Sequence, residues 1–123
     1  MELATPVADA LNRFLDLSSL ELKTTAQNMA NIDTPGYRTV GFDFASEMRR
    51  SLDSLNQSGG TGTLPAVQTG PVDGLVERPD GNNVSMDREG MKMAEAQLQF
   101  RTGVELLKHE FTRVLDAIHE DQK

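Results

Sequence analysis

Residues 86–118 read MDREGMKMAEAQLQFRTGVELLKHEFTRVLDAI, and the spacing of their apolar positions decides the fold. Steps of four and three residues connect Met86, Gly90, Met93, Gln97, Phe100, Val104, Leu107, Phe111, Val114 and Ile118. Such a heptad seam stays on one side of a helix only when that helix supercoils against a partner. The stretch therefore predicts a helix about 50 Å long that needs a second helix to cover its seam.

The N-terminal stretch predicts that second helix, from Thr5 to about Ile32. Threonine followed by proline is a typical helix start, because the hydroxyl caps a free backbone N–H and Pro6 lacks the N–H that a first turn leaves unpaired. The same alternation of steps gives Ala8, Leu11, Leu15, Ser18, Leu22, Thr25, Met29 and Ile32. We interpret Ser18 and Thr25 as polar interruptions of this seam.

The middle of the chain differs from both ends. Residues 58–63 are glycine-rich and residues 69–71 read TGP, which favours loops. We expect residues 38–84 to be irregular and partly disordered, with one possible short helix at 44–55. Residues 1–37 and 85–123 would together form one assembly domain. The predicted fold is mainly α with little β, its long terminal helices packing as an antiparallel coiled-coil hairpin or bundle.

Composition excludes several classes of function. The chain has 123 residues, a net charge of −7, no cysteine and no cluster of basic residues. Nucleic acid and anionic membranes are therefore disfavoured as partners, and disulfides and thiolate metal sites are excluded. No run approaches the roughly 20 apolar residues that span a bilayer, and nothing resembles a cleavable secretory signal. We expect no membrane insertion, no cofactor and no metal, and any export to proceed without a cleaved signal peptide.

Residues 30–37 read ANIDTPGY and follow directly on the first predicted helix. Asn31 tolerates the left-handed conformation that often ends a helix, and Pro35 disfavours helical geometry in the residue before it. Pro35 and Gly36 fit the centre of a type II turn, in which glycine supplies a positive φ. Tyr37 would then leave the turn in a set direction as an anchor.

Ala30, Asn31, Thr34, Pro35, Gly36 and Tyr37, placed at the end of an N-terminal amphipathic helix, resemble the signature of the bacterial flagellar axial proteins, the rod and hook family. A second stretch, DGNNVSMDRE at residues 80–89 leading into AEAQLQF at 94–100, resembles short subunits of the proximal rod. The resemblance covers roughly residues 8–38 and 78–118. Residues 43–75 are unmatched.

The resemblance implies a structural subunit, not an enzyme, of the proximal rod of the flagellar basal body, serving motility. Such a subunit would be made in the cytoplasm, exported unfolded by the flagellar type III apparatus and polymerised helically in the periplasm through its terminal helices. Its partners would be other copies of itself, other proximal rod subunits and the junction protein between the MS ring and the rod. We assign the assembly seam to Leu11, Leu15, Leu22, Met29, Phe100, Val104, Leu107, Phe111, Val114 and Ile118.

An isolated hairpin of two such helices would be marginally stable, so we expect frayed helices in the monomer that become ordered on assembly. We also expect the longer C-terminal seam to nucleate the assembly contact. The alternatives are another short flagellar rod subunit, a generic coiled-coil adaptor, and a peptidoglycan hydrolase that uses Glu47, Asp87 and Glu89 as acid and base.

Overall fold

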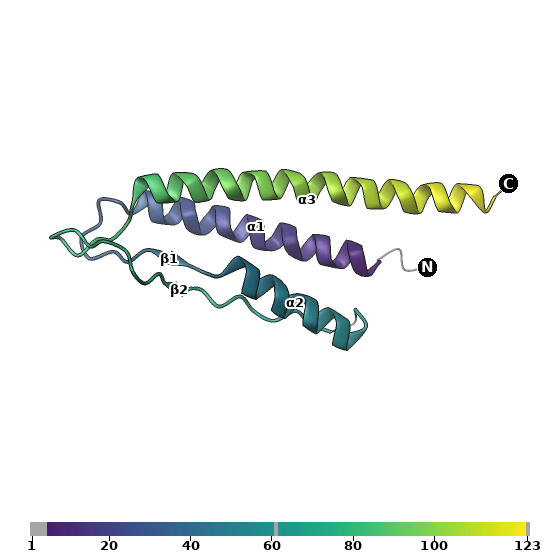
Figure 1. Ribbon diagram of the computed structural model, residues 1–123, viewed down its shortest axis with the longest axis horizontal. Coiled ribbons are helices and arrows are strands. Elements are labelled where there is room, and N and C mark those ends of the chain that lie inside the picture. Colours follow the sequence, from purple (N-terminus) through teal and green to yellow (C-terminus); the bar gives the residue numbers. More distant parts are fainter. Residues whose placement is uncertain (1–4, 61, 123) are drawn as a thin grey trace.

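The computed structural model describes residues 5–60 and 62–122. The elements in chain order are α1 (Pro6–Ala30), β1 (Val40–Gly41), α2 (Phe44–Ser58), β2 (Gly70–Pro71) and α3 (Met86–Glu120). α1 and α3 lie side by side as an antiparallel hairpin, and α2 packs on the other side of α1 (Figure 1). The predicted mainly helical fold, with long terminal helices packed together and little strand, is confirmed.

Each helix begins at a residue whose side chain caps it. The side-chain oxygen accepts a hydrogen bond from the backbone N–H three residues later, at 3.1 Å for Thr5, 3.2 Å for Asp43 and 3.4 Å for Ser85. The predicted start of α1 at Thr5 and Pro6 is confirmed. α2 is longer than the expected 44–55, because it continues to Ser58 and ends where Gly59 adopts the left-handed conformation, with φ of 59°.

The segment that connects α2 with α3 contains β2, which forms a two-stranded ribbon with β1 from the segment before α2. β1 and β2 pair antiparallel, with Val40 opposite Pro71. Before the ribbon, residues 65–68 are held by the helices: Arg13 donates to the carbonyl of Pro65 at 2.7 Å and Arg50 to that of Ala66 at 2.6 Å. Glu47 accepts from the backbone N–H of Gln68 at 3.4 Å. Disorder in this segment stays a prediction, and these contacts favour order at residues 65–68.

The contact between α1 and α3 includes several small buried residues. Ser18 is 0% exposed, Thr25 is 2% exposed and Ala96 is 0% exposed. At Gly103 the helices approach so closely that a Cβ would lie 2.8 Å from the side chain of Leu15. Ser18 and Thr25, which we interpreted as polar interruptions of the seam, are thus buried, and their small side chains allow the helices to approach closely.

The most deeply buried heptad row of α3 is Glu89, Ala96, Gly103 and Glu110, which lies beside the seam expected from the sequence. At about 100° per residue, Phe100 and Phe111 lie roughly 40° to 60° around α3 from Ala96. They remain 37% and 48% exposed. The subunit itself therefore covers only part of the predicted seam.

The partly exposed seam residues share one side of the hairpin. On α1, Leu15 and Leu22 lie roughly 40° to 60° from Ser18 in the same rotational sense, and they are half-buried. Because the helices run antiparallel, equal rotations about the two axes point to the same side of the pair. We call this surface the open flank; it comprises Leu15, Leu22, Met29, Phe100, Val104 and Phe111.

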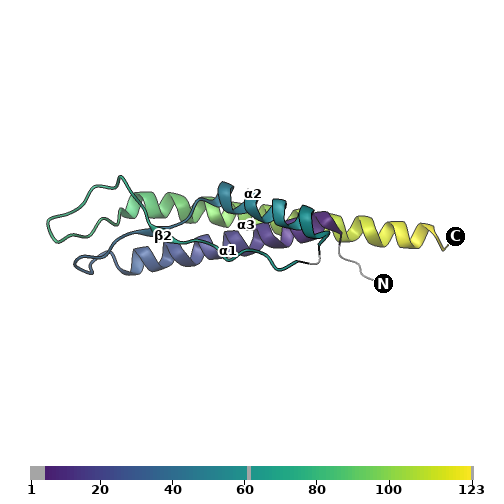
Figure 2. The ribbon, with the colours of Figure 1, turned by 90° about the horizontal axis from the view of Figure 1, so that it is seen from below.

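α3 is longer than its partner and continues past it. The Thr5 hydroxyl donates to Glu110 Oε1 at 2.8 Å, which sets the start of α1 opposite Glu110. Residues 111–120 extend beyond that point, as Figures 1 and 2 show. We call these ten residues the overhang. None of the helices within residues 5–60 and 62–122 is both long enough and apolar enough to cross a membrane.

Candidate functional site: a polar clasp at the closed end of the hairpin

The two stretches that carry the family resemblance meet at the end of the hairpin opposite the termini. The turn predicted at Pro35 and Gly36 is confirmed: Gly36 has φ of 74°, and the backbone N–H of Tyr37 donates to the carbonyl of Thr34 at 3.2 Å. The N–H of Gly36 then donates to the carbonyl of Asp80 at 2.9 Å. A Cβ at Gly81 would lie 3.3 Å from Gly36 Cα, so the two loops are in close backbone contact.

Asn31 ends α1 differently from the prediction. Its φ of −103° and ψ of 19° are not left-handed. Instead, its side-chain nitrogen donates to the carbonyl of Gln27 at 2.8 Å, and its side-chain oxygen accepts from the Thr34 hydroxyl at 3.1 Å. The asparagine side chain thus replaces the left-handed backbone in satisfying this helix end.

Asn82, in the loop before α3, binds the loop that follows α1 through its side chain. It is 0% exposed. Its side-chain nitrogen lies 2.9 Å from the carbonyl oxygen of Asn31, 3.1 Å from that of Ile32 and 2.8 Å from that of Thr34. Its side-chain oxygen accepts from the N–H of Val84 at 2.8 Å. One buried amide therefore satisfies carbonyls that the end of α1 leaves without helical partners.

Asn28, in the last turn of α1, joins three other elements. Its side-chain oxygen accepts from the Tyr37 hydroxyl and from the N–H of Val40, both at 3.0 Å. Its side-chain nitrogen donates to the carbonyl of Val40 at 2.8 Å and to Glu89 Oε2 at 3.1 Å. Glu89, 1% exposed, is neutralised by Arg88 at 2.6 Å. All the hydrogen-bonding groups of the Asn28 amide are thereby used.

Asn83 completes the network, which we call the clasp: Asn28, Tyr37, Asn82, Asn83 and Glu89. Asn83 accepts from the N–H of Thr39 at 2.7 Å, and its own carbonyl accepts from the Thr39 hydroxyl at 3.2 Å. The pKa of the Tyr37 phenol is raised by partial burial and further by the negative charge of Glu89. The clasp thus contains a neutral phenol and fixes the end of α1, the start of β1 and the start of α3 relative to one another.

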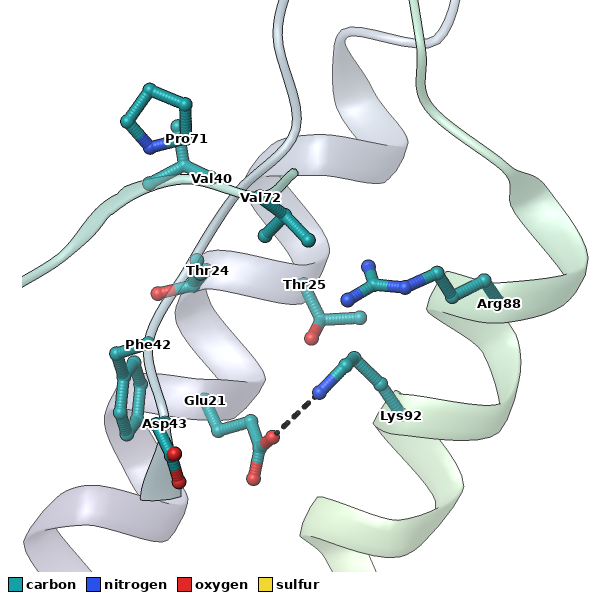
Figure 3. A pocket seen from close by; sticks show the side chains of 11 residues that line it. Glu21, Thr24, Thr25, Val40, Phe42, Asp43, Pro71, Val72, Arg88 and Lys92 are labelled. Atoms are coloured by element: carbon teal, nitrogen blue, oxygen red, sulfur yellow. Dashed lines mark hydrogen bonds and ion pairs between the residues drawn. The ribbon is translucent and has the colours of Figure 1, made fainter. Parts of the chain in front are cut away.

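A pocket of about 280 Å³ with both polar and apolar lining residues adjoins the clasp, between α1, the ribbon and the first turns of α3 (Figure 3). Glu21 and Lys92 face each other across it at 3.4 Å. The other carboxylate oxygen of Glu21 is buried and has no hydrogen-bond partner among the described residues. The pocket is large enough for water, which would satisfy this oxygen.

The chain resembles curated proteins over most of its length. It is 32% identical to the flagellar basal body rod protein FlgB of Salmonella typhimurium over a 129-residue alignment, which covers 89% of this chain and 94% of the relative. The FlgB of Escherichia coli K12 gives the same identity and coverage. The chain belongs to the FlgB family. The FlgB of Borrelia hermsii is 27% identical over 122 residues, covering 86% of this chain and 90% of that protein. No family model matches the chain.

Membership of the FlgB family makes the chain a structural protein of the flagellar basal body rod and not an enzyme. Two of the three carboxylates considered for a hydrolase have structural surroundings, and the third, Asp87, is exposed in the first turn of α3. Glu47 pairs with Arg50 at 2.6 Å on α2, and Glu89 lies inside the clasp. Among the described residues, no group of three or more histidine, cysteine or acidic side chains is arranged to hold a metal.

Some residues of the predicted family signature contact the clasp through a side chain, and others through the backbone. Tyr37 contacts Asn28 directly, and Asn31, Thr34 and Gly36 contribute through their backbones. Ala30 and Pro35 are exposed. Sequence reasoning missed Asn28 and the roles of Asn82 and Asn83. The pair of asparagines after an Asp-Gly turn was the one signal that could have indicated them.

Proposed function

We propose that the chain is a subunit of the proximal rod that is exported unfolded through the flagellar type III pathway and polymerises helically through its terminal helices. Its partners would be other copies of itself, other proximal rod subunits and the MS-ring junction protein, and the assembled rod would serve motility. The observation that carries the assembly step is the open flank. Apolar side chains on α1 and α3 lie there on one side of the hairpin and stay partly exposed, and no other helix or strand of the described residues packs over them.

Only part of the predicted assembly seam would contact neighbouring subunits in this proposal. Leu15, Leu22, Phe100 and Phe111 lie on the open flank and would contact neighbours. Leu107 and Val114 lie nearer the buried row by helical rotation, so they serve packing within the subunit as well. Burial of roughly half a large apolar side chain stabilises a contact by about 1 kcal/mol, so six such residues on each face supply a useful driving force.

The clasp supports the same proposal, because it is made on folding and uses no covalent link. The chain contains no cysteine. Its closed end is held by hydrogen bonds between segments about 50 residues apart, such as Asn82 to Ile32. A chain that arrives unfolded could form these bonds without an oxidant or a cofactor.

The test is a matched pair of substitutions on opposite sides of α3. Phe100→Asp places a charge on the open flank, where Phe100 is 37% exposed, and Leu98→Asp places the same charge on the back of the helix, where Leu98 is 66% exposed. The single copy of the gene would carry each change, and the amounts of the chain in the cell and in isolated basal bodies would be measured. Normal cellular abundance with loss from basal bodies is expected for Phe100→Asp only. Equal incorporation of both variants would refute assembly through the open flank.

A further inference from the structure

An apolar hollow lies on the other side of the hairpin, between α2 and α3 over the first turns of α1. Its volume is about 370 Å³, and it is lined chiefly by Val7, Ala10, Phe14, Met48, Leu52 and Leu106. All residues that line it are apolar. A cavity of about 150 Å³ holds a benzene ring, so this hollow has room for more than one large side chain.

The hollow is open because α2 packs on α1 and not on α3 among the described residues. Phe44 packs edge-on against Phe14 with ring centroids 5.3 Å apart and fills the space toward the ribbon. Toward the termini, Val7 stays 50% exposed and Leu52 stays 37% exposed. Within residues 5–60 and 62–122, no helix therefore occupies the position between α2 and α3 at this end of the subunit.

The overhang of α3 begins at the same end of the molecule and is also uncovered. Phe111 is 48% exposed and Leu115 is 54% exposed. By helical rotation these two side chains and Ile118 lie within roughly 60° of one another. At 1.5 Å per residue the ten residues span roughly 15 Å, so the overhang is long enough to cover the hollow along α1 from Val7 to Phe14, which is roughly 11 Å.

We infer that the hollow takes the overhang of a second copy of the chain, a contact that rests on the proposed self-assembly and specifies one of its interfaces. The occupant is matched in chemistry, because an apolar helix face enters a hollow that offers no polar partner. It is matched in form, because the space beside α2 and α3 would take a helix, and the overhang is a helix that packs on no other element of the described chain. Each feature is incomplete in the subunit, and the other completes it.

The arrangement is open-ended. The hollow and the overhang are different patches of the same chain, so the contact is heterologous and leaves one free patch at each end of a row of subunits. For parallel copies, Leu115 of one chain reaches the level of Leu106 of the next when the two are shifted along the helix by roughly nine residues, or about 14 Å. Repeating that shift with a rotation generates a helical assembly.

The chain offers a clean background for disulfide mapping because it has no cysteine. Leu52→Cys places a thiol in the hollow and Leu115→Cys places one on the overhang. The matched control is Asp53→Cys with Asp116→Cys, which puts thiols at adjacent exposed positions of the same helices that point elsewhere. Basal bodies from strains whose only copy carries one pair would be treated with copper phenanthroline and separated without reductant. Strains with either single cysteine show how much linking occurs between identical positions.

The Leu52→Cys and Leu115→Cys pair is expected to give a ladder of dimers, trimers and higher species, and the control pair and single variants no trimers. Only dimers from the double variant would overturn the inference in favour of a closed two-fold exchange. Absence of linking, or an equal ladder from the control pair, would overturn it outright. If the control chain itself is missing from basal bodies, the proposed function fails; if it is present, failure to link concerns this interface alone.

Discussion

Replacing Asn82 by alanine removes the residue that joins the two loops of the clasp. The amide has two N–H groups, shared among three carbonyls at 2.8–3.1 Å, and one oxygen that accepts from Val84. Three hydrogen bonds at about 1 kcal/mol each are lost. The buried N–H of Val84 is also left without an acceptor. We therefore expect a loss of about 3–4 kcal/mol in the free energy of unfolding, which lowers the melting temperature by roughly 10 °C or more.

The assay is urea unfolding followed by helical circular dichroism and by the fluorescence of Tyr37, the single tyrosine in a chain without tryptophan. Asn56→Ala is the matched control, because Asn56 is exposed on α2 and should change stability by no more than about 0.5 kcal/mol. Asn82→Asp keeps the shape but turns an unprotonated oxygen toward the carbonyls, so at neutral pH it should cost at least as much. An Asn82→Ala chain within about 0.5 kcal/mol of the parent would refute the clasp as a stabilising element.

Three further predictions concern single sites. Gly90→Ala should stabilise α3 by about 0.5–1 kcal/mol, because a Cβ added there has no neighbouring atom within 4 Å. Gly103→Ala should be less favourable than Gly90→Ala by at least about 1 kcal/mol, because its Cβ would lie 2.8 Å from the Leu15 side chain on α1. Thermal unfolding of the two variants compares these effects. The pKa of Tyr37 in the folded chain should exceed its ordinary value of 10.0. The contribution of the neutral phenol to the free energy of unfolding is therefore fully present below about pH 10 and is lost as pH rises through the raised pKa. An unshifted pKa in an ultraviolet titration of tyrosinate would contradict this. Lys92→Met leaves the buried Glu21 carboxylate without its ion-pair partner and should lower the free energy of unfolding by about 1–2 kcal/mol. Adding Glu21→Gln should restore most of that loss. A double-mutant cycle without coupling would show that the 3.4 Å contact contributes nothing to stability.

Local features were predictable because their causes lie within a few residues. Thr5 and Pro6 predict a helix start through capping and fixed φ, and Gly36 predicts a turn through its positive φ. The heptad spacing predicts two long helices that pair. Each of these depends on backbone chemistry that neighbours in sequence decide.

The clasp could not be predicted in the same way. Asn28 and Asn82 are far apart in sequence, and asparagine occurs both in exposed turns and in buried networks, so residue type alone does not distinguish the two uses. The contact row of α3 also differed from the expected seam. The heptad spacing of apolar residues shows that α3 has an apolar side. Which of two adjacent heptad rows of α3 faces α1 depends on where small residues such as Ser18 and Gly103 let the two helices approach.

Density from electron cryomicroscopy of isolated basal bodies tests the central claim most directly, that this chain builds into the rod as a clasped hairpin whose open flank contacts neighbours. The account predicts α1 and α3 packed through Ser18 and Gly103, with Phe100 and Phe111 covered by helices of adjacent subunits. A rod without this chain, or a rod in which those two phenylalanines face solvent, would contradict it.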